Sequence, residues 1–371
     1  MNAPHPSDRF LLAPSLRARL LAEHRPKPAL YWADLLVSAT VAWGAFVGLF
    51  FVPILSVATV VLTLVSIVAF LRAGSFMHEL QHRNPRELPG LHVAWNLLVG
   101  IPALVPSLMM HPHASHHFPG SFATFDDPEY APIARWPRWR ILNSLVAYAA
   151  IAAFMPIRWG VVTPLSRLHP ALRRHAIGQL STADVARGYD RPDPTGAPAR
   201  IFRLQEWACF AVVWGVLAAN IAGWIPWELQ LHRLVVMGVV LAVNQARLLV
   251  VHRYDRSEGV PVSPREQTLD AWTFGDDPVS RVVAPIGFSY HALHHELPTL
   301  PYHAMGEVHR HLLAELPADH PYRGTQIDGF LGALRIRWAE AKENPSWPLP
   351  AWGADQASAA ATASPRAAAE G

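Results

Sequence analysis

The chain has 371 residues, and its 31 basic and 28 acidic side chains make up only 16% of them, against about a quarter in an ordinary soluble domain. Apolar residues make up 51% and gather in blocks long enough to cross a bilayer, which argues against a plain soluble protein. The single cysteine, Cys209, lies in one of these blocks, which excludes a disulfide framework and a zinc–thiolate site. Twenty histidines in a chain so poor in charge point to imidazole as the metal ligand.

Two apolar stretches follow a basic N-terminal segment, residues 1–29. Residues 30–51 contain one charge, Asp34, and residues 53–71 contain none, so each has the length of a membrane-spanning helix. Because the two stretches nearly abut, they predict a helical hairpin with a very short turn. The basic segment before them lacks the features of a cleavable signal peptide.

Two further apolar stretches are not interpreted as spans: residues 93–110, broken by Pro102 and Pro106, predict an interfacial or re-entrant piece, and residues 141–162 are expected to lie on the membrane. About 30 residues separate His82 from His113, too few to cross, turn and recross at about 20 residues per crossing. A crossing by residues 141–162 alone would place the later histidines on the opposite side of the bilayer from the earlier ones. We therefore expect neither stretch to span.

Residues 207–225, which are uncharged, and residues 229–251, which contain only Arg233 and Arg247, predict a second hairpin. Lys and Arg gather before and after the first hairpin and before the second, so the positive-inside rule places both termini and the central segment in the cytoplasm. The sequence thus predicts a multi-pass protein of the inner (cytoplasmic) membrane with four spans. Its Ala-rich tail, residues 351–371, is expected to be disordered.

Three short histidine clusters and one separate histidine carry the chemistry. Histidines four apart share a helix face, and the second and third clusters place histidines at i, i+3 and i+4. The separate histidine, His252, follows the fourth span and is expected at the same side of the membrane as His82. The candidate metal ligands are His78, His82, His113, His116, His117, His252, His291, His294 and His295. This number exceeds the three or four protein ligands of a zinc site and fits two metals.

The first cluster alone has an alternative interpretation. His78, Glu79 and His82 match the zinc-peptidase pattern, in which the glutamate acts as general base. An intramembrane zinc metalloprotease is a remote alternative, because such an enzyme needs only one further ligand and has no use for seven.

Carboxylates near the clusters and polar residues within the fourth span are candidates for supporting the metal site. Carboxylates beside ligating imidazoles often accept the outer N–H, although surface charge is an equally good interpretation. These carboxylates are Asp126, Asp127 and Asp270. Polar residues within the fourth span are costly in lipid, so we expect them to pack against the metal domain. They are Asn244, Gln245 and Arg247.

Histidines outside the clusters receive no ligand role. His111 lies next to the second cluster as a neighbour or an outer partner. His303, His309 and His311 are expected on the surface of a cytosolic helix.

The boxes His78-x-x-x-His82, His113-x-x-His116-His117 and His291-x-x-His294-His295, with the run HHELPTLPY after the third, resemble the membrane fatty acid desaturase superfamily over about residues 30–325. The resemblance implies an all-α integral membrane fold: four transmembrane helices as two hairpins, with a cytosolic helical cap that holds a histidine-ligated di-iron site. It also implies that His252 is the additional ligand between the second and third boxes. Residues 1–29 and 326–371 would be cytosolic terminal segments.

The family's chemistry implies an oxidoreductase that uses O2 and externally supplied electrons. Desaturation of a fatty acyl chain in lipid metabolism is the leading prediction, and hydroxylation or ketolation of a lipid or carotenoid is the alternative. The substrate would be a membrane lipid or an acyl-carrier conjugate.

The electrons must come from outside the chain. The sequence has no Gly-rich dinucleotide fingerprint, no cysteine cluster and no His-Pro-Gly-Gly haem motif. Electrons from NAD(P)H are therefore expected through a separate ferredoxin or cytochrome b5-type carrier. Nothing in the sequence resembles a nucleic-acid-binding motif.

Overall fold

The structure, a computed structural model, describes residues 10–118, 120–124, 127, 129, 130, 133, 134, 136–182, 191–255 and 262–343. Every regular element in this part is a helix, and the extended pairing within it consists of isolated bridges. The predicted all-α class is confirmed. The tail predicted to be disordered, residues 351–371, lies outside the described residues.

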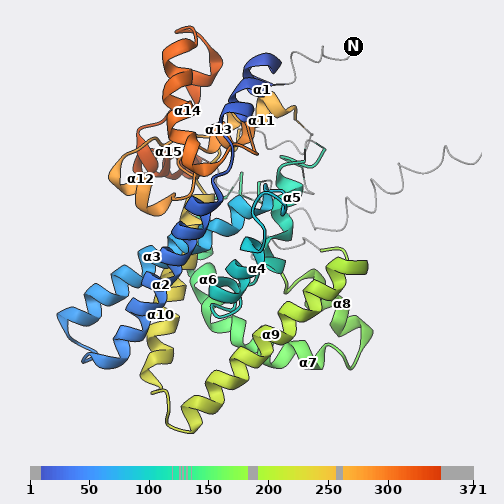
Figure 1. Ribbon diagram of the computed structural model, residues 1–371, viewed down its shortest axis with the longest axis vertical. Helices are drawn as coiled ribbons and strands as arrows, with labels where there is room; N and C mark the ends of the chain where they lie inside the picture. Colours follow the sequence, from blue (N-terminus) through green and yellow to red (C-terminus); the bar gives the residue numbers. More distant parts are fainter. Residues whose placement is uncertain are drawn as a thin grey trace, which may run out of the picture.

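The predicted first hairpin is formed by α2 (Pro28–Gly48), extended by η2 (Leu49–Phe51), and by α3 (Val57–Gln81), which lie side by side in Figure 1. Small buried residues such as Ala39 and Ala42 of α2 allow close approach, and Ser66 Oγ of α3 donates to the Ala42 carbonyl at 3.1 Å. Helix α3 continues past its predicted end at residue 71. Its last turns therefore carry the first histidine cluster.

The second hairpin consists of α9 (Gly196–Ile221) and α10 (Glu228–Leu248), which meet at one end and diverge (Figure 1). Helix α6 (Arg138–Ile157), continued by η5 (Arg158–Val162) and α7 (Thr163–Leu165), lies antiparallel along α10. Two hydrogen bonds fix this pairing. Gln245 Nε2 donates to Ser144 Oγ at 3.2 Å, and Arg233 donates to the Ala152 carbonyl at 3.1 Å.

Within the described residues, five helices are long and apolar enough to cross a membrane, which fits a membrane protein. Four of them correspond to the predicted spans. The fifth, Arg138–Leu165, includes the stretch expected to lie on the membrane. That expectation is not confirmed, because this helix has the length and hydropathy of a span and packs along α10 rather than apart from it. The number of crossings and the side that each end faces stay predictions.

The stretch from residue 93 to residue 110 is broken, as its prolines predict. It contains the end of α4 (Leu91–Trp95), the π-helix η3 (Asn96–Gly100) and η4 (Ser107–Met110), and it leads into α5 (His111–His116). The indole N–H of Trp95 donates to the Ala73 carbonyl of α3 at 2.8 Å, which ties this segment to the first hairpin. The stretch thus positions the second histidine cluster beside the end of α3. A further helix, α8 (Pro170–Gly178), precedes α9.

The remaining helices gather at the end of the molecule where α3 and α10 terminate (Figure 1). They are α1 (Pro14–Glu23), α11 (Pro264–Asp270), α12 (Pro278–Val283), α13 (His291–Glu296), α14 (Tyr302–Glu315), η6 (Pro321–Thr325) and α15 (Gly329–Glu343). We call this group the helical cap. The surface position predicted for His309 is wrong: its side chain is buried against η6, with Nδ1 2.9 Å from the Tyr322 hydroxyl.

Candidate metal centre

Four separate segments bring the predicted ligands together. The end of α3 supplies the first cluster, α5 and the residue after it the second, and α13 the third, while His252 follows α10. Short extended pairings hold the last two segments in register: the Trp272 N–H donates to the Val251 carbonyl at 2.8 Å, and the Ala292 N–H donates to the Trp272 carbonyl at 3.2 Å. Residues near 272 therefore link His252 directly to α13.

Helix α13 is anchored from its far side by Glu296. This fully buried carboxylate accepts hydrogen bonds from the Leu11 and Leu12 N–H groups at 3.1 and 3.0 Å and from Thr268 Oγ at 3.1 Å. Arg17 of α1 forms an ion pair with it at 2.7 Å. The N-terminal segment thus fixes the helix that carries the third cluster.

All nine predicted ligands fall into two compact groups whose candidate ligand atoms lie within 4.8 Å of one another. The five-histidine group consists of His78, His82, His113, His117 and His294. The four-histidine group consists of His116, His252, His291 and His295. His111 belongs to neither. Adjacent histidines of one cluster are divided between the groups, because a single turn can direct neighbouring imidazoles in two directions.

The Nε2 atoms within each group converge. In the five-histidine group, His82 and His113 bring theirs to 2.9 Å, and His117 and His294 to 3.1 Å. In the four-histidine group, His252 lies 3.0 Å from both His116 and His291, and His295 lies 3.2 Å from His291. Two ligand atoms at right angles on one metal, each bound at about 2.1 Å, lie about 3 Å apart. The spacing therefore fits a shared metal at the centre of each group.

Unpartnered buried nitrogens give a second test of this fit. Both ring nitrogens of His78 are buried without a hydrogen-bond partner. Because an unpaired buried polar atom is costly, a metal bound by one nitrogen would remove part of that cost. All-imidazole donor sets suit zinc, copper, iron or nickel, but zinc sites with five protein ligands are unusual.

Burial keeps most of these histidines neutral, which is the form that binds metal. Burial, then the neighbouring imidazoles, lowers the pKa of His291, His294 and His295 well below the usual value. His116 differs: burial alone would lower its pKa, but the Asp127 carboxylate outweighs burial and raises it.

Three carboxylates lie against the outer nitrogens. Asp127 Oδ2 is 3.0 Å from His116 Nδ1, and Asp270 Oδ2 is 3.2 Å from His252 Nδ1. Both of these carboxylates thus contact histidines of the four-histidine group. Glu129 Oε2 is 3.1 Å from His113 Nδ1 in the five-histidine group. Although burial would raise the pKa of Glu129, His113 lowers it to about 2. Such partners fix the tautomer that presents Nε2 to a metal.

Of the two interpretations left open for these carboxylates, the buried positions of Asp127 and Asp270 beside histidines favour the outer partner over surface charge, whereas Asp126 lies outside the described residues. The sequence analysis missed Glu129. It lies 12 residues after His117, at a separation that matches no helical spacing, so it gave no periodic signal. The one sequence signal for it was its place two residues after Asp127, among the carboxylates that follow the second cluster.

Glu79 does not occupy a general-base position. It is buried and accepts from the Tyr31 hydroxyl, from Arg83 Nε at 2.8 Å and from the Tyr302 N–H at 3.3 Å. These contacts lie on a different face of α3 from His78 and His82. The zinc-peptidase interpretation thus loses its catalytic glutamate.

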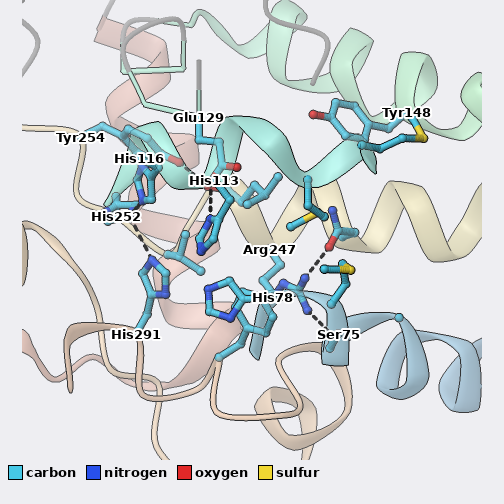
Figure 2. A pocket seen from close by; sticks show the side chains of 18 residues that line it. Ser75, His78, His113, His116, Glu129, Tyr148, Arg247, His252, Tyr254 and His291 are labelled. Atoms are coloured by element: carbon cyan, nitrogen blue, oxygen red, sulfur yellow. Dashed lines mark hydrogen bonds and ion pairs between the residues drawn. The ribbon is translucent and has the colours of Figure 1, made fainter. Parts of the chain in front are cut away.

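A cavity of about 90 Å³ adjoins both histidine groups. Figure 2 shows His78 and His113 of one group, and His116, His252 and His291 of the other, on its wall. Much of the remaining lining is apolar and comes from four elements: α3, η4, α6 and α10. Its residues include Gly74, Met77, Met109, Met110, Tyr148 and Leu248. The arrangement can hold an apolar segment of a substrate directly beside the imidazoles.

The backbone before the third cluster is unusual where it enters the cavity. Ile286 and Gly287 have φ angles of 53° and 80°, and a Cβ on Gly287 would come within 2.6 Å of the Met305 sulfur. This tight turn places Phe288 against the first cluster, with its ring centroid 4.2 Å from that of His78.

Comparisons with known proteins agree with the boxes. A family model described as fatty acid desaturase matches residues 54–326. The ceramide hydroxylase of Caulobacter vibrioides (strain NA1000 / CB15N) is 36% identical over 330 residues, covering 86% of this chain and 93% of that protein. No solved structure gives a significant match.

Proposed function

Because this chain belongs to the fatty acid desaturase family, we propose that it is a di-iron hydroxylase of a ceramide-type membrane lipid. The observation that carries the proposal is the convergence of nine imidazoles into two groups beside one cavity. Iron is favoured over zinc because the five-histidine group exceeds the usual zinc ligand number and because the family is di-iron. The nine histidines are the proposed ligands.

Hydroxylation replaces desaturation as the favoured reaction. The hydroxylase named above covers nearly the whole chain, so it supports the alternative of the sequence analysis better than the leading prediction. Both reactions begin at an unactivated C–H bond, and the placement of the substrate decides between them.

Three sets of residues have separate roles in the proposed reaction. When bound, the iron pair supplies the activation of O2 that breaking a C–H bond requires. The imidazoles hold the metals, and Asp127, Asp270 and Glu129 orient three of those rings. The apolar wall of the cavity excludes water and holds the methylene to be oxidised.

The overall reaction requires electrons from outside. One oxygen atom of O2 enters the C–H bond as a hydroxyl group, and the other leaves as water after uptake of two electrons and two protons. We propose a separate ferredoxin or cytochrome b5-type carrier, supplied by NAD(P)H, as the donor. We further propose that both termini and the helical cap face the cytoplasm, where such a carrier is available.

Lipid mass spectrometry tests the proposal. A host that contains ceramides would express the wild-type chain, His294→Ala or His311→Ala under ¹⁸O2. His311 lies on α14 and pairs with Glu315 at 3.2 Å outside both groups, so its variant is the matched control. We expect ceramides with one added ¹⁸O in the wild type and the control only.

Two results would contradict this function. A product lighter by two hydrogens would restore desaturation, and unchanged lipids with iron-loaded protein and a supplied electron carrier would reject a ceramide substrate.

A further inference from the structure

One corner of the cavity carries a buried positive charge. Arg247 of α10 lines the cavity and is only 4% exposed. Its guanidinium donates to Ser75 Oγ at 3.0 Å and to Asn244 Oδ1, and lies over the Phe288 ring, 3.6 Å from its centroid. Within the described part of the chain, none of these contacts is a carboxylate. The Glu129 carboxylate lines the same cavity and its charge acts on the guanidinium from a distance, but no hydrogen bond joins the two side chains among the described residues. A buried charge without a directly paired carboxylate is costly, so a function is expected for it.

Asn244 adds a second donor to the same corner. Because its Oδ1 accepts from Arg247, its NH2 group is turned away from the guanidinium, and it makes no hydrogen bond within the described residues. Asn244 also lines the cavity. Ser75 Oγ, by contrast, already donates to the Leu71 carbonyl at 2.7 Å. The buried Arg247 Nε–H, which has no hydrogen-bond partner, and the Asn244 NH2 group are therefore the donors left over at this corner, and they suit a ligand oxygen with free lone pairs.

This corner lies close to the predicted metals. The guanidinium stacks on Phe288, and the Phe288 ring centroid is 4.2 Å from that of His78. Phe288 thus contacts both the charge and a proposed ligand, and Figure 2 shows Arg247 and His78 on the lining of the same cavity. With about 90 Å³ available, the cavity holds only a short piece of a lipid. An oxygen bound here must therefore lie within a few bonds of the carbon beside the histidines.

We propose that Arg247 and Asn244 bind the amide carbonyl oxygen of the lipid substrate and direct hydroxylation to a carbon near that amide. A carbonyl oxygen has two lone pairs for the two donors and adds no second charge. The proposal rests on the function proposed above, and it adds the substrate group that is recognised and the region of the chain that is oxidised.

The direct test measures binding, which needs no turnover. The dissociation constants of a short-chain ceramide and of an uncharged ether analogue, with an O–CH2 link in place of the amide, would be compared in detergent. Charged hydrogen bonds contribute about 1.5–3 kcal/mol, so wild-type protein should bind the analogue about 10- to 150-fold more weakly. Arg247→Met should weaken ceramide binding by a similar factor and leave binding of the analogue unchanged.

Arg233→Met is the matched control, because Arg233 also lies on α10 but does not line the cavity. It should bind both lipids as the wild type does. If Arg247→Met does not fold, the wild-type comparison of the two lipids decides alone. Product analysis adds a second readout: the wild-type hydroxyl should lie within a few carbons of the amide, and Arg247→Lys should spread it over more positions.

Equal wild-type affinity for both lipids would overturn the proposal, as would a hydroxyl far along the acyl chain or tighter binding of a free fatty acid than of ceramide. A different result would show that the proposed hydroxylase function is wrong while the binding proposal holds. In that case the two lipids still differ in binding as expected, but no oxygen is added to either.

Discussion

The two histidine groups differ in exposure and in support. All members of the four-histidine group are buried, whereas His82 and His117 of the five-histidine group are partly exposed. The four-histidine group has two carboxylates against its outer nitrogens, and the five-histidine group has one. The group with fewer histidines is thus the more deeply buried one and has more carboxylate contacts to its rings. We infer that the four-histidine group would hold a metal more rigidly and that the five-histidine group would exchange one more readily.

Removing one ligand from either group should have the largest effect. His291→Ala in the four-histidine group and His294→Ala in the five-histidine group should each lose about one iron per chain and abolish hydroxylation, because both metals are needed for the chemistry. Elemental analysis of the purified variants gives the iron count. Retained iron with full activity in both variants would contradict the assignment of the groups.

Filling the cavity should separate metal binding from catalysis. A Cβ at Gly74 meets nothing within 4 Å, and this residue lines the cavity, so Gly74→Leu should place its side chain in the space for substrate. Activity should fall about 100-fold, as expected for a displaced substrate, while both irons stay bound.

Gly44→Leu on α2 provides the control for this substitution, because Gly44 also has open space but lies away from the cavity. Normal activity in Gly74→Leu would show that the substrate binds elsewhere.

The carboxylates should affect the groups separately. Asp270→Asn should weaken metal binding in the four-histidine group by about 10- to 100-fold, and Glu129→Gln should do so in the five-histidine group, because each carboxylate orients one ligand. Competition with a metal-binding dye measures each affinity. Asp276→Asn, which removes a surface partner of Arg310, should change neither. An equal loss from both groups in either variant would argue that the groups act as one site.

The smallest expected effect concerns the rate of metal loss. A chelator should remove iron in two phases, with the first phase several-fold faster, because solvent reaches His82 and His117 more easily than the buried group. Absorbance of the iron–chelator complex follows both phases. In Asp270→Asn the slow phase should become faster, because Asp270 supports the four-histidine group. If Glu129→Gln accelerates the slow phase instead, the five-histidine group is the one that loses its metal slowly, which would contradict the inferred order.

The convergence of the nine histidines could be predicted from sequence because each cluster depends on short-range geometry. Spacings of three and four residues determine which imidazoles share a helix face, and His252 could be placed by the direction of its span. Glu129 could not be found in this way, since it lies 16 residues after His113 and their contact is a tertiary one that follows no helical spacing.

Helix packing limited the prediction of the fold. Residues 141–162 were placed on the membrane by counting crossings, but the pairing of α6 with α10 through Ser144 and Gln245 is a tertiary contact without a local signal. His309 was misplaced for a similar reason, because its burial depends on η6, which lies close to it only in the folded chain.

Counting the metals in the purified wild-type protein tests the central claim most directly. Elemental analysis combined with Mössbauer spectroscopy of ⁵⁷Fe-grown protein should show two iron ions per chain, in two distinguishable environments that correspond to the five- and four-histidine groups. A single zinc ion per chain, or one iron with the four-histidine group empty, would contradict the account.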